Sequence, residues 1–224
     1  MSDSKSFFEA IRAGDLSKVE SLLQADSSLA SAREASGASP VLVATYAGRS
    51  EICNLLLARG GQLEIHDAAA AGHLDRVKEL VAKKPALAKA FSPDGFPVVS
   101  LAAVFGHFDV ARFLAEKGAD ISAVATNGTG YNALTGSVTS GHTEMVKWLL
   151  ETGADPNYRY GPGYTPLLAA AANGRLEIVK LLLAHGADLR ATSNDGKSAL
   201  ALATERNHSA VAEFLKEASA AQAG

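Results

Sequence analysis

The chain has 224 residues, of which 47% are hydrophobic, 20% charged and only 6% aromatic, and its formal charge is −3 at pH 7. This composition is typical of a globular protein with ample material for a core, and the scarcity of aromatic residues favours closely packed short helices over β-sandwiches or barrels. Acidic and basic residues are interspersed, which argues against nucleic acid and against an anionic membrane as the main partner, because both require a basic surface.

The cysteine content and the first residues bear on the compartment. Cys53 is the single cysteine, so the chain can form no internal disulfide and nothing points to an oxidising environment. The start MSDSKSFFEAIRAGD lacks the basic end and apolar run of a signal peptide. No apolar run approaches the roughly 20 residues needed to cross a bilayer. We therefore expect a cytoplasmic protein without membrane contact.

A glycine recurs at nearly regular intervals along the chain. The intervals are 34, 24, 34, 35, 33 and 33 residues, and asparagine takes the last position: Gly14, Gly48, Gly72, Gly106, Gly141, Gly174 and Asn207. Asparagine fits there because it tolerates the left-handed backbone conformation better than most residues. Repetition with this period, around helix–turn–helix patterns, predicts a helical solenoid.

The first and third copies depart from the pattern. The first, over residues 7–23, has no turn-forming segment before it and predicts an N-terminal cap. The third begins directly after Gly60 and Gly61, and it is ten residues short, because the interval there is 24 rather than 34. We therefore expect the loop between the second and third copies to be missing, with a break in the array near residues 60–62.

The later copies differ in other ways. The fifth carries Gly136 inside its first helix, residues 133–140, where a larger side chain is expected. Either a neighbouring side chain fills this gap or the helix is weak, because glycine costs roughly 1 kcal/mol in a helix. The last copy, over residues 198–218, is rich in charge and predicts a C-terminal cap. A single domain over residues 1–218 and a short disordered tail at 219–224 follow.

Several segments share a more specific pattern. The helix boundaries, the turn glycine and a closing Gly-Ala-Asp recur together in YTPLLAAAANGRLEIVKLLLAHGAD, LAAVFGHFDVARFLAEKGADIS, GHTEMVKWLLETGADPN and GRSEICNLLLARG. These segments resemble the ankyrin repeat. The resemblance covers roughly residues 5–218 and implies about seven repeats, in an all-α, ankyrin-type helical solenoid with short β-hairpin fingers. Cys53 takes the position of a buried valine, so we expect a thiol with a raised pKa and low reactivity.

The sequence contains no motif for catalysis or metal binding. His73, His107 and His142 each follow the turn glycine, where the family resemblance implies that histidine braces the turn. His66 and Asp67 are the nearest approach to an acid–base pair, but neighbours along a helix face different directions, so their adjacency does not imply a hydrogen bond between them. We therefore expect no enzymatic activity, no cofactor and no metal ion.

The ankyrin resemblance implies that partners bind the finger tips and the ends of the first helices of each pair, on the concave face. We predict that the residues at these positions contact a partner: Tyr46, Phe96, Val104, Phe105, Tyr131, Tyr158, Arg159, Tyr160 and Tyr164. Tyrosine, phenylalanine and arginine are typical of interface hot spots. The alternative is that the rings pack only against the neighbouring finger and stiffen the array.

These observations favour a non-catalytic protein–protein interaction module, acting as an adaptor, inhibitor or regulatory partner. One alternative is a small-ligand or enzymatic site in the notch around His66 and Asp67, and another is a self-associating structural protein. We expect a monomer, with a homodimer as the alternative. Asn157 matches a position at which ankyrin repeats are hydroxylated in animals, and the sequence leaves its modification open.

Overall fold

The structure is a computed structural model that describes residues 2–221. The described residues form fourteen α-helices and two 3₁₀ helices and contain no regular β-strand. They divide into two compact units: the residues up to 102 together with 109–119, and residues 103–108 together with those from 120 onward. None of the helices in residues 2–221 is both long enough and apolar enough to span a bilayer.

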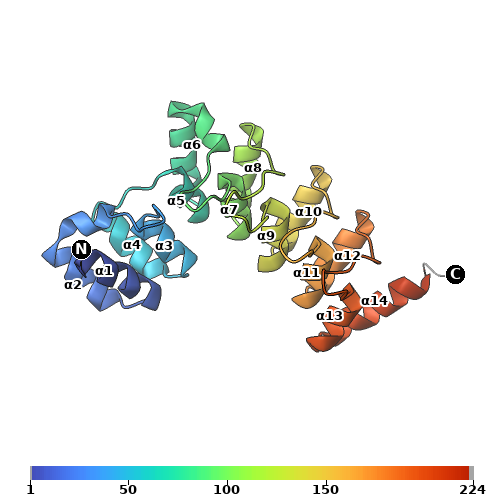
Figure 1. Cartoon of the computed structure of the whole chain (residues 1–224). Coiled ribbons are helices and arrows are strands. Elements are labelled where there is room, and N and C mark those ends of the chain that lie inside the picture. The colour runs from blue at the N-terminus through green and yellow to red at the C-terminus, as the bar shows by residue number, and fades with distance from the viewer. Residues whose placement is uncertain (1, 222–224) are drawn as a thin grey trace. The chain divides into compact units, whose positions relative to one another are not determined.

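Each unit is built of helix pairs (Figure 1). The first unit contains α1 (Ser2–Ala13), α2 (Leu16–Ala25), η1 (Ser27–Ser31), α3 (Pro40–Tyr46), α4 (Ser50–Ala58), α5 (Ile65–Ala70), α6 (Leu74–Lys83), η2 (Pro85–Lys89), most of α7 (Val98–Val104) and most of α8 (Phe108–Glu116). The second contains α9 (Ala133–Ser140), α10 (Thr143–Glu151), α11 (Pro166–Ala172), α12 (Leu176–Ala184), α13 (Ala199–Glu205) and α14 (Ser209–Ala221). The all-α fold class predicted from the sequence is confirmed.

Like helices pack on like helices within each unit. The first helices of successive pairs form one layer, α1 on α3 on α5 and α9 on α11 on α13. The second helices form another layer, α2 on α4 and α10 on α12 on α14. The layers enclose a core of small and branched side chains, including the fully buried Leu42, Leu56, Leu134, Leu149 and Leu168. Every pair thus depends on its neighbours to cover its apolar face.

The starts of the first helices are set by side-chain caps. Ser39 Oγ accepts a hydrogen bond from the Leu42 amide at 3.0 Å, and Asn132 Oδ1 accepts one from the Thr135 amide at 2.9 Å. Ser198 and Thr165 cap α13 and α11 in the same way. Such caps satisfy amides that have no partner within the helix.

The turn between the two helices of a pair is tied to the preceding pair. In three of the repeats, the residue after the turn position bonds the carbonyl of the residue two positions before the preceding turn. Arg49 donates to the Arg12 carbonyl at 3.0 Å, while His142 and His208 bond the carbonyls of Val104 and Ala172 at 2.9 and 3.1 Å. His142 and His208 therefore brace their turns, as the family pattern implies.

Asn207 confirms a detail of the repeat assignment. Its φ of 59° places it in the left-handed region, and it is the one non-glycine residue with positive φ among residues 2–221. It thus occupies the same conformation as the turn glycine of the preceding pair, Gly174, whose φ is 66°. The last copy of the repeat is therefore intact in the backbone although its glycine has been replaced.

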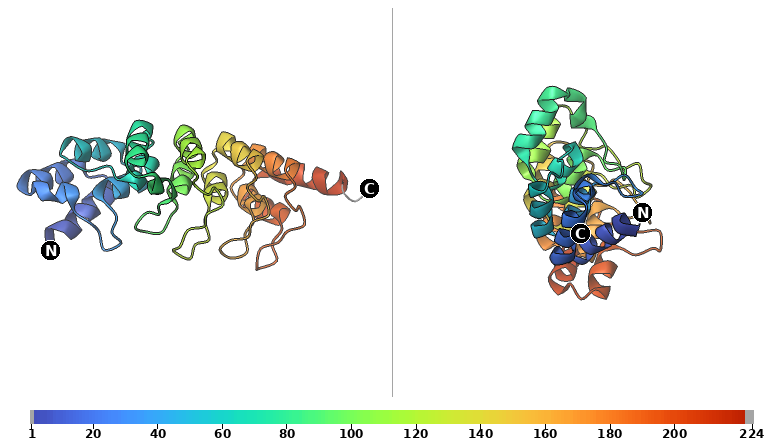
Figure 2. Two further views of the ribbon diagram at one scale, coloured as in Figure 1. Left: turned by 90° about the horizontal axis from the view of Figure 1, so that it is seen from above. Right: turned by 90° about the vertical axis from the view of Figure 1, so that its left-hand side faces the viewer.

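The fingers differ from the expected β-hairpins. Those of the second unit project to one side of the helices (Figure 2). They contain only isolated bridges, such as the one between Tyr160 and Tyr164, whose amides and carbonyls exchange two hydrogen bonds of 2.9 Å. The pairing does not continue beyond this bridge, because the next residue, Thr165, already caps α11 and Pro166, the first residue of that helix, has no amide hydrogen to donate. Short hairpins were thus a wrong expectation for the described residues.

The connection between α4 and α5 consists of residues 59–64 alone, whereas residues 117–132 join α8 to α9. It therefore has no room for a finger. The first unit continues across this link, since α3 packs on α5.

At the C-terminal end of the described residues, α14 extends to Ala221, so residues 219–221 are helical and not part of a disordered tail. Residues 222–224 of that predicted tail lie outside the described residues.

Candidate functional site

The residues predicted to contact a partner are divided between the two units. Tyr46 and Phe96 belong to the first unit, and the other seven belong to the second: Val104, Phe105, Tyr131, Tyr158, Arg159, Tyr160 and Tyr164. Two groups of candidate contacts follow, one around Tyr46 and one on the fingers before α9 and α11. Each group is described on its own.

The tyrosines of the second unit form a cluster between neighbouring fingers. The Tyr131 and Tyr160 rings lie 5.2 Å apart between centroids, and the Tyr158 ring stacks on Tyr160 at 6.4 Å. The Tyr158 hydroxyl donates to the Gly130 carbonyl at 3.0 Å. Tyr160 is only 8% exposed, and this burial raises the pKa of its phenol. Tyr158 and Tyr160 therefore hold one finger against the next, while Tyr131 and Tyr164 remain half-buried.

The same finger is also tied to the one that follows it. Arg159 donates to the Thr192 carbonyl at 2.9 Å, and the Asn194 amide donates to the Pro162 carbonyl at 3.1 Å. The Asn157 side chain bonds both the Gly186 carbonyl and the Asp188 amide, at 2.9 and 2.7 Å. These bonds hold the finger in one conformation before a partner binds. Binding therefore costs little conformational entropy in the finger.

Val104 is the last residue of α7, and Phe105 follows it in the turn that contains Gly106. Both are half-buried. A β-carbon built on Gly136 would lie 2.3 Å from Val104 Cγ2. The valine thus fills the space above Gly136 and has a packing role in addition to any contact with a partner. Of the two explanations for Gly136, the structure supports a neighbouring side chain that fills the gap.

The exposed residue Tyr46 lies at the edge of a hollow in the first unit. The hollow has a volume of about 460 Å³ and is lined by Arg12, Glu34, Ser36, Ala38, Val43, Tyr46, Ala47 and Asp94. The Tyr46 side chain is 39% exposed, and its hydroxyl donates to Asp94 Oδ1 at 3.2 Å. Two effects raise the pKa of Tyr46 well above its usual value: desolvation of its hydroxyl, and the negative charge of the Asp94 carboxylate. A polar group is thereby fixed beside an apolar ring, as at many binding surfaces.

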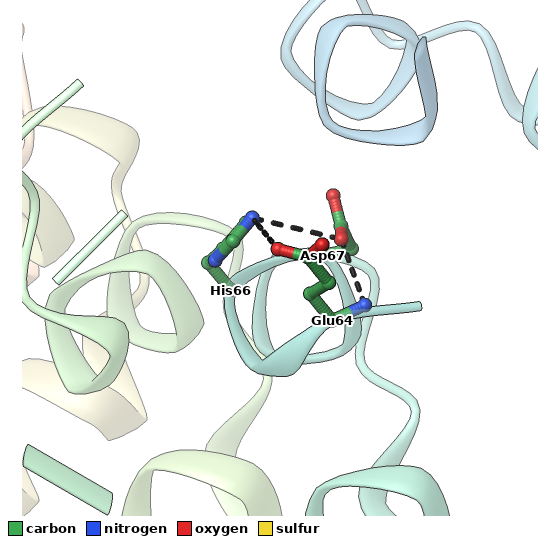
Figure 3. A group of neighbouring side chains, drawn as sticks. All are labelled: Glu64, His66 and Asp67. Atoms are coloured by element: carbon green, nitrogen blue, oxygen red, sulfur yellow. Dashed lines mark hydrogen bonds and ion pairs between the residues drawn. The ribbon is translucent and has the colours of Figure 1, made fainter. Parts of the chain in front are cut away.

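A second candidate site lies at the start of α5, where the sequence suggested a notch. Figure 3 shows the His66 ring directed toward the carboxylates of Glu64 and Asp67. His66 Nε2 lies 3.4 Å from Glu64 Oε2 and 3.6 Å from Asp67 Oδ2. The two side chains thus approach each other although they are neighbours on a helix, but no hydrogen bond joins them. Both residues lie in the first turn of a helix, where Asp67 folds back to accept a hydrogen bond from the Glu64 amide.

Asp67 is fully buried yet held by several partners. Its Oδ1 accepts a hydrogen bond from Ser39 Oγ, and its Oδ2 accepts one of 2.8 Å from the Glu64 amide. Burial raises the pKa of this carboxyl. Because Ser39 also caps α3, Asp67 links the starts of two neighbouring helices. One ligand atom from each of Glu64, His66 and Asp67 lies within 4.8 Å of the others, which makes these residues a candidate metal-binding group.

Sequence reasoning missed several members of both sites. The residues that line the hollow beside Tyr46 come from four segments, with Arg12 and Glu34 joined as an ion pair and Asp94 contributed by a distant finger. Glu64 and Ser39 were missed beside His66 and Asp67. A signal for Glu64 was present, because a carboxylate three residues after a helix cap position indicates a capping interaction. Nothing comparable in the sequence pairs Tyr46 with Asp94.

The sequence was compared with models of known families and with curated proteins, and the matches are to ankyrin-repeat proteins. The sequence model described as "Ankyrin repeats (3 copies)" matches residues 65–160 and 156–223. Two curated relatives bear the name "Ankyrin repeat and SAM domain-containing protein 6". The one from Mus musculus is 35% identical over 92 residues, which is 41% of this chain and 10% of the relative. The one from Rattus norvegicus is 33% identical over 96 residues, 43% of this chain and 11% of the relative. The matched part is thus about a tenth of each relative.

Proposed function

This chain belongs to the ankyrin-repeat family, and we propose that it is a non-catalytic module that binds another protein through its finger loops and the adjoining ends of its first helices. It would act as an adaptor, inhibitor or regulatory partner. The proposal treats residues 1–218 as one binding domain.

The observation that carries the proposal is the pairing of a rigid frame with accessible aromatic side chains. Tyr46 is exposed beside the hollow of the first unit, and Tyr131 and Tyr164 are half-buried on fingers that are bonded to their neighbours. Partly exposed tyrosines on a preorganised surface bind at low entropic cost. In this proposal Tyr46, Phe96, Val104, Phe105, Tyr131, Arg159 and Tyr164 contact the partner, while Tyr158 and Tyr160 position the finger.

The proposal is tested by affinity capture from the native organism, followed by mass spectrometry. The bait is the full chain, compared with the variants Y46A and Y164A. Each substitution should reduce recovery of the specific partner at least tenfold, since hot-spot residues are worth about 2 kcal/mol or more. K147A serves as the matched control, because Lys147 is exposed on α10, in the layer of second helices, and should leave recovery unchanged.

Circular dichroism must first show that the variants are folded. If both tyrosine variants recover every partner as well as the unmodified chain does, the proposed surface is wrong. If K147A alone abolishes capture, binding occurs through the second helices instead.

Two other functions compete with this proposal. A small-ligand or enzymatic site around His66 and Asp67 is favoured by the polar groups that converge there. The second competing function is self-association through the aromatic surface proposed to bind the partner. Analytical ultracentrifugation at several concentrations separates a homodimer from the monomer that we propose.

We also propose a cytoplasmic location, which the reduced single cysteine favours. Nucleic acid is not expected as a partner of a chain whose net charge is −3.

A further inference from the structure

One buried polar atom in the first unit has no hydrogen-bond partner although it faces two carboxylates. The His66 side chain is only 7% exposed, and its Nε2 makes no hydrogen bond. Leaving such a nitrogen unsatisfied in a protein interior is costly, and native structures contain few examples. The arrangement therefore calls for an explanation beyond packing.

The distances around this nitrogen match those of a metal site. His66 Nε2 lies 3.4 Å from Glu64 Oε2 and 3.6 Å from Asp67 Oδ2. These separations are long for hydrogen bonds. Two ligands on a tetrahedral Zn²⁺ ion with bonds of about 2.1 Å are themselves about 3.4 Å apart. The three side chains converge on one point in Figure 3.

We propose that Glu64, His66 and Asp67 bind one Zn²⁺ ion through Oε2, Nε2 and Oδ2, with water as the fourth ligand. The donor set is one imidazole and two carboxylates, which suits zinc and disfavours Mg²⁺, since that ion prefers oxygen ligands. The Glu64 side chain is 47% exposed and leaves one side of the site open to solvent.

The remaining bonds of the ligands hold them in place for the ion. Glu64 Oε1 pairs with Arg33, which leaves Oε2 to face His66. Asp67 Oδ1 accepts from Ser39, and Oδ2 has a second lone pair beside the one that receives the Glu64 amide. Outer bonds of this kind orient carboxylate ligands. The ion would thus reinforce the start of α5, at the connection that has no finger.

The test is isothermal titration of the full chain with ZnCl₂, in parallel with the variants H66Q and E64Q. The unmodified chain should bind one Zn²⁺ per molecule, and each variant should bind at least tenfold more weakly. H73Q is the matched control, because His73 lies in the same repeat but is exposed and outside the cluster, and it should bind like the unmodified chain. Titration with MgCl₂ should give no comparable binding.

A second readout guards against a variant that folds poorly. Zinc should raise the melting temperature of the unmodified chain and of H73Q by roughly 5 °C at a hundredfold excess over Kd, and should not raise that of E64Q. E64Q alters a side chain at the surface and should leave the fold intact. Absence of zinc binding by the unmodified chain would overturn the proposal. So would H66Q and E64Q variants that bind zinc as tightly as the unmodified chain does.

Discussion

A β-carbon built on Gly136 would lie 2.3 Å from Cγ2 of Val104, so the valine occupies the space that the glycine leaves. The contact lies within the second unit, between the last residue of α7 and the middle of α9, and explains why a glycine is tolerated in the middle of a helix. A glycine at this position is therefore one half of a packing pair.

The first prediction concerns this pair. G136A should destabilise the chain by about 1–2 kcal/mol, because the added methyl group overpacks a fixed neighbour. In the V104A background the same substitution should stabilise by up to about 1 kcal/mol, since alanine is then free to express its higher helix propensity. Urea unfolding of the four proteins of the double-mutant cycle measures both effects. Equal effects of G136A in the two backgrounds would show that the two residues do not interact.

The second prediction concerns Asn157. Its side chain donates to the Gly186 carbonyl and accepts from the Asp188 amide, so N157A removes two bonds between neighbouring repeats. We expect a loss of about 1–2 kcal/mol in the free energy of unfolding. N157D keeps the acceptor and loses the donor, so its free energy of unfolding should lie between those of N157A and the unmodified chain. Thermal unfolding ranks the three proteins, and an N157A variant as stable as the unmodified chain would contradict the prediction.

The third prediction separates two tyrosines of one finger. Y160A should cost about 3 kcal/mol of stability, because Tyr160 is buried between the rings of Tyr131 and Tyr158. Y164A should cost less than about 1 kcal/mol, because the Tyr164 ring is half-buried and its bonds to Tyr160 are made by the backbone. Denaturant unfolding of both variants tests the difference. The reverse order of stabilities would mean that their roles are exchanged.

The fourth prediction concerns Cys53. Desolvation by burial raises the pKa of the thiol, outweighing the contact with Thr45 Oγ1 at 3.5 Å. At a pH near 8, the fraction of Cys53 present as the reactive thiolate is therefore smaller in the folded protein than in the unfolded chain. Alkylation by iodoacetamide should be at least about tenfold slower in the native protein than in urea, and its pH profile should be shifted upward. Identical rates in the two states would show that the thiol is neither shielded nor perturbed.

The repeat frame could be predicted from the sequence because it depends on local patterns. The turn glycines, the Thr165 cap and the apolar stripes each specify their own conformation, and even the left-handed Asn207 follows from its place in the period. The limits of the fingers were harder to predict. A hairpin and a loop with a single bridge share the same glycines, and the pairing of Tyr160 with Tyr164 ends only because α11 starts at once with the Thr165 cap and Pro166.

The candidate sites could be predicted only in part. The positions of the aromatic residues follow from the period, but their exposure depends on contacts between fingers, which is why Tyr160 is buried and Tyr46 is exposed. The approach of His66 to Asp67 depends on the first turn of a short helix and on Ser39, 28 residues away in the chain. Such contacts between separate repeats leave no trace in the local pattern.

The central claim is that a partner binds the finger loops and the ends of the first helices. Hydrogen–deuterium exchange of the full chain, with and without the captured partner, tests it most directly. We predict slower exchange in the partner complex at residues 45–48, 94–106, 126–132 and 158–165, with little change in α4, α10 and α12. Protection confined to those second helices, with the fingers exchanging as in the free chain, would contradict the claim.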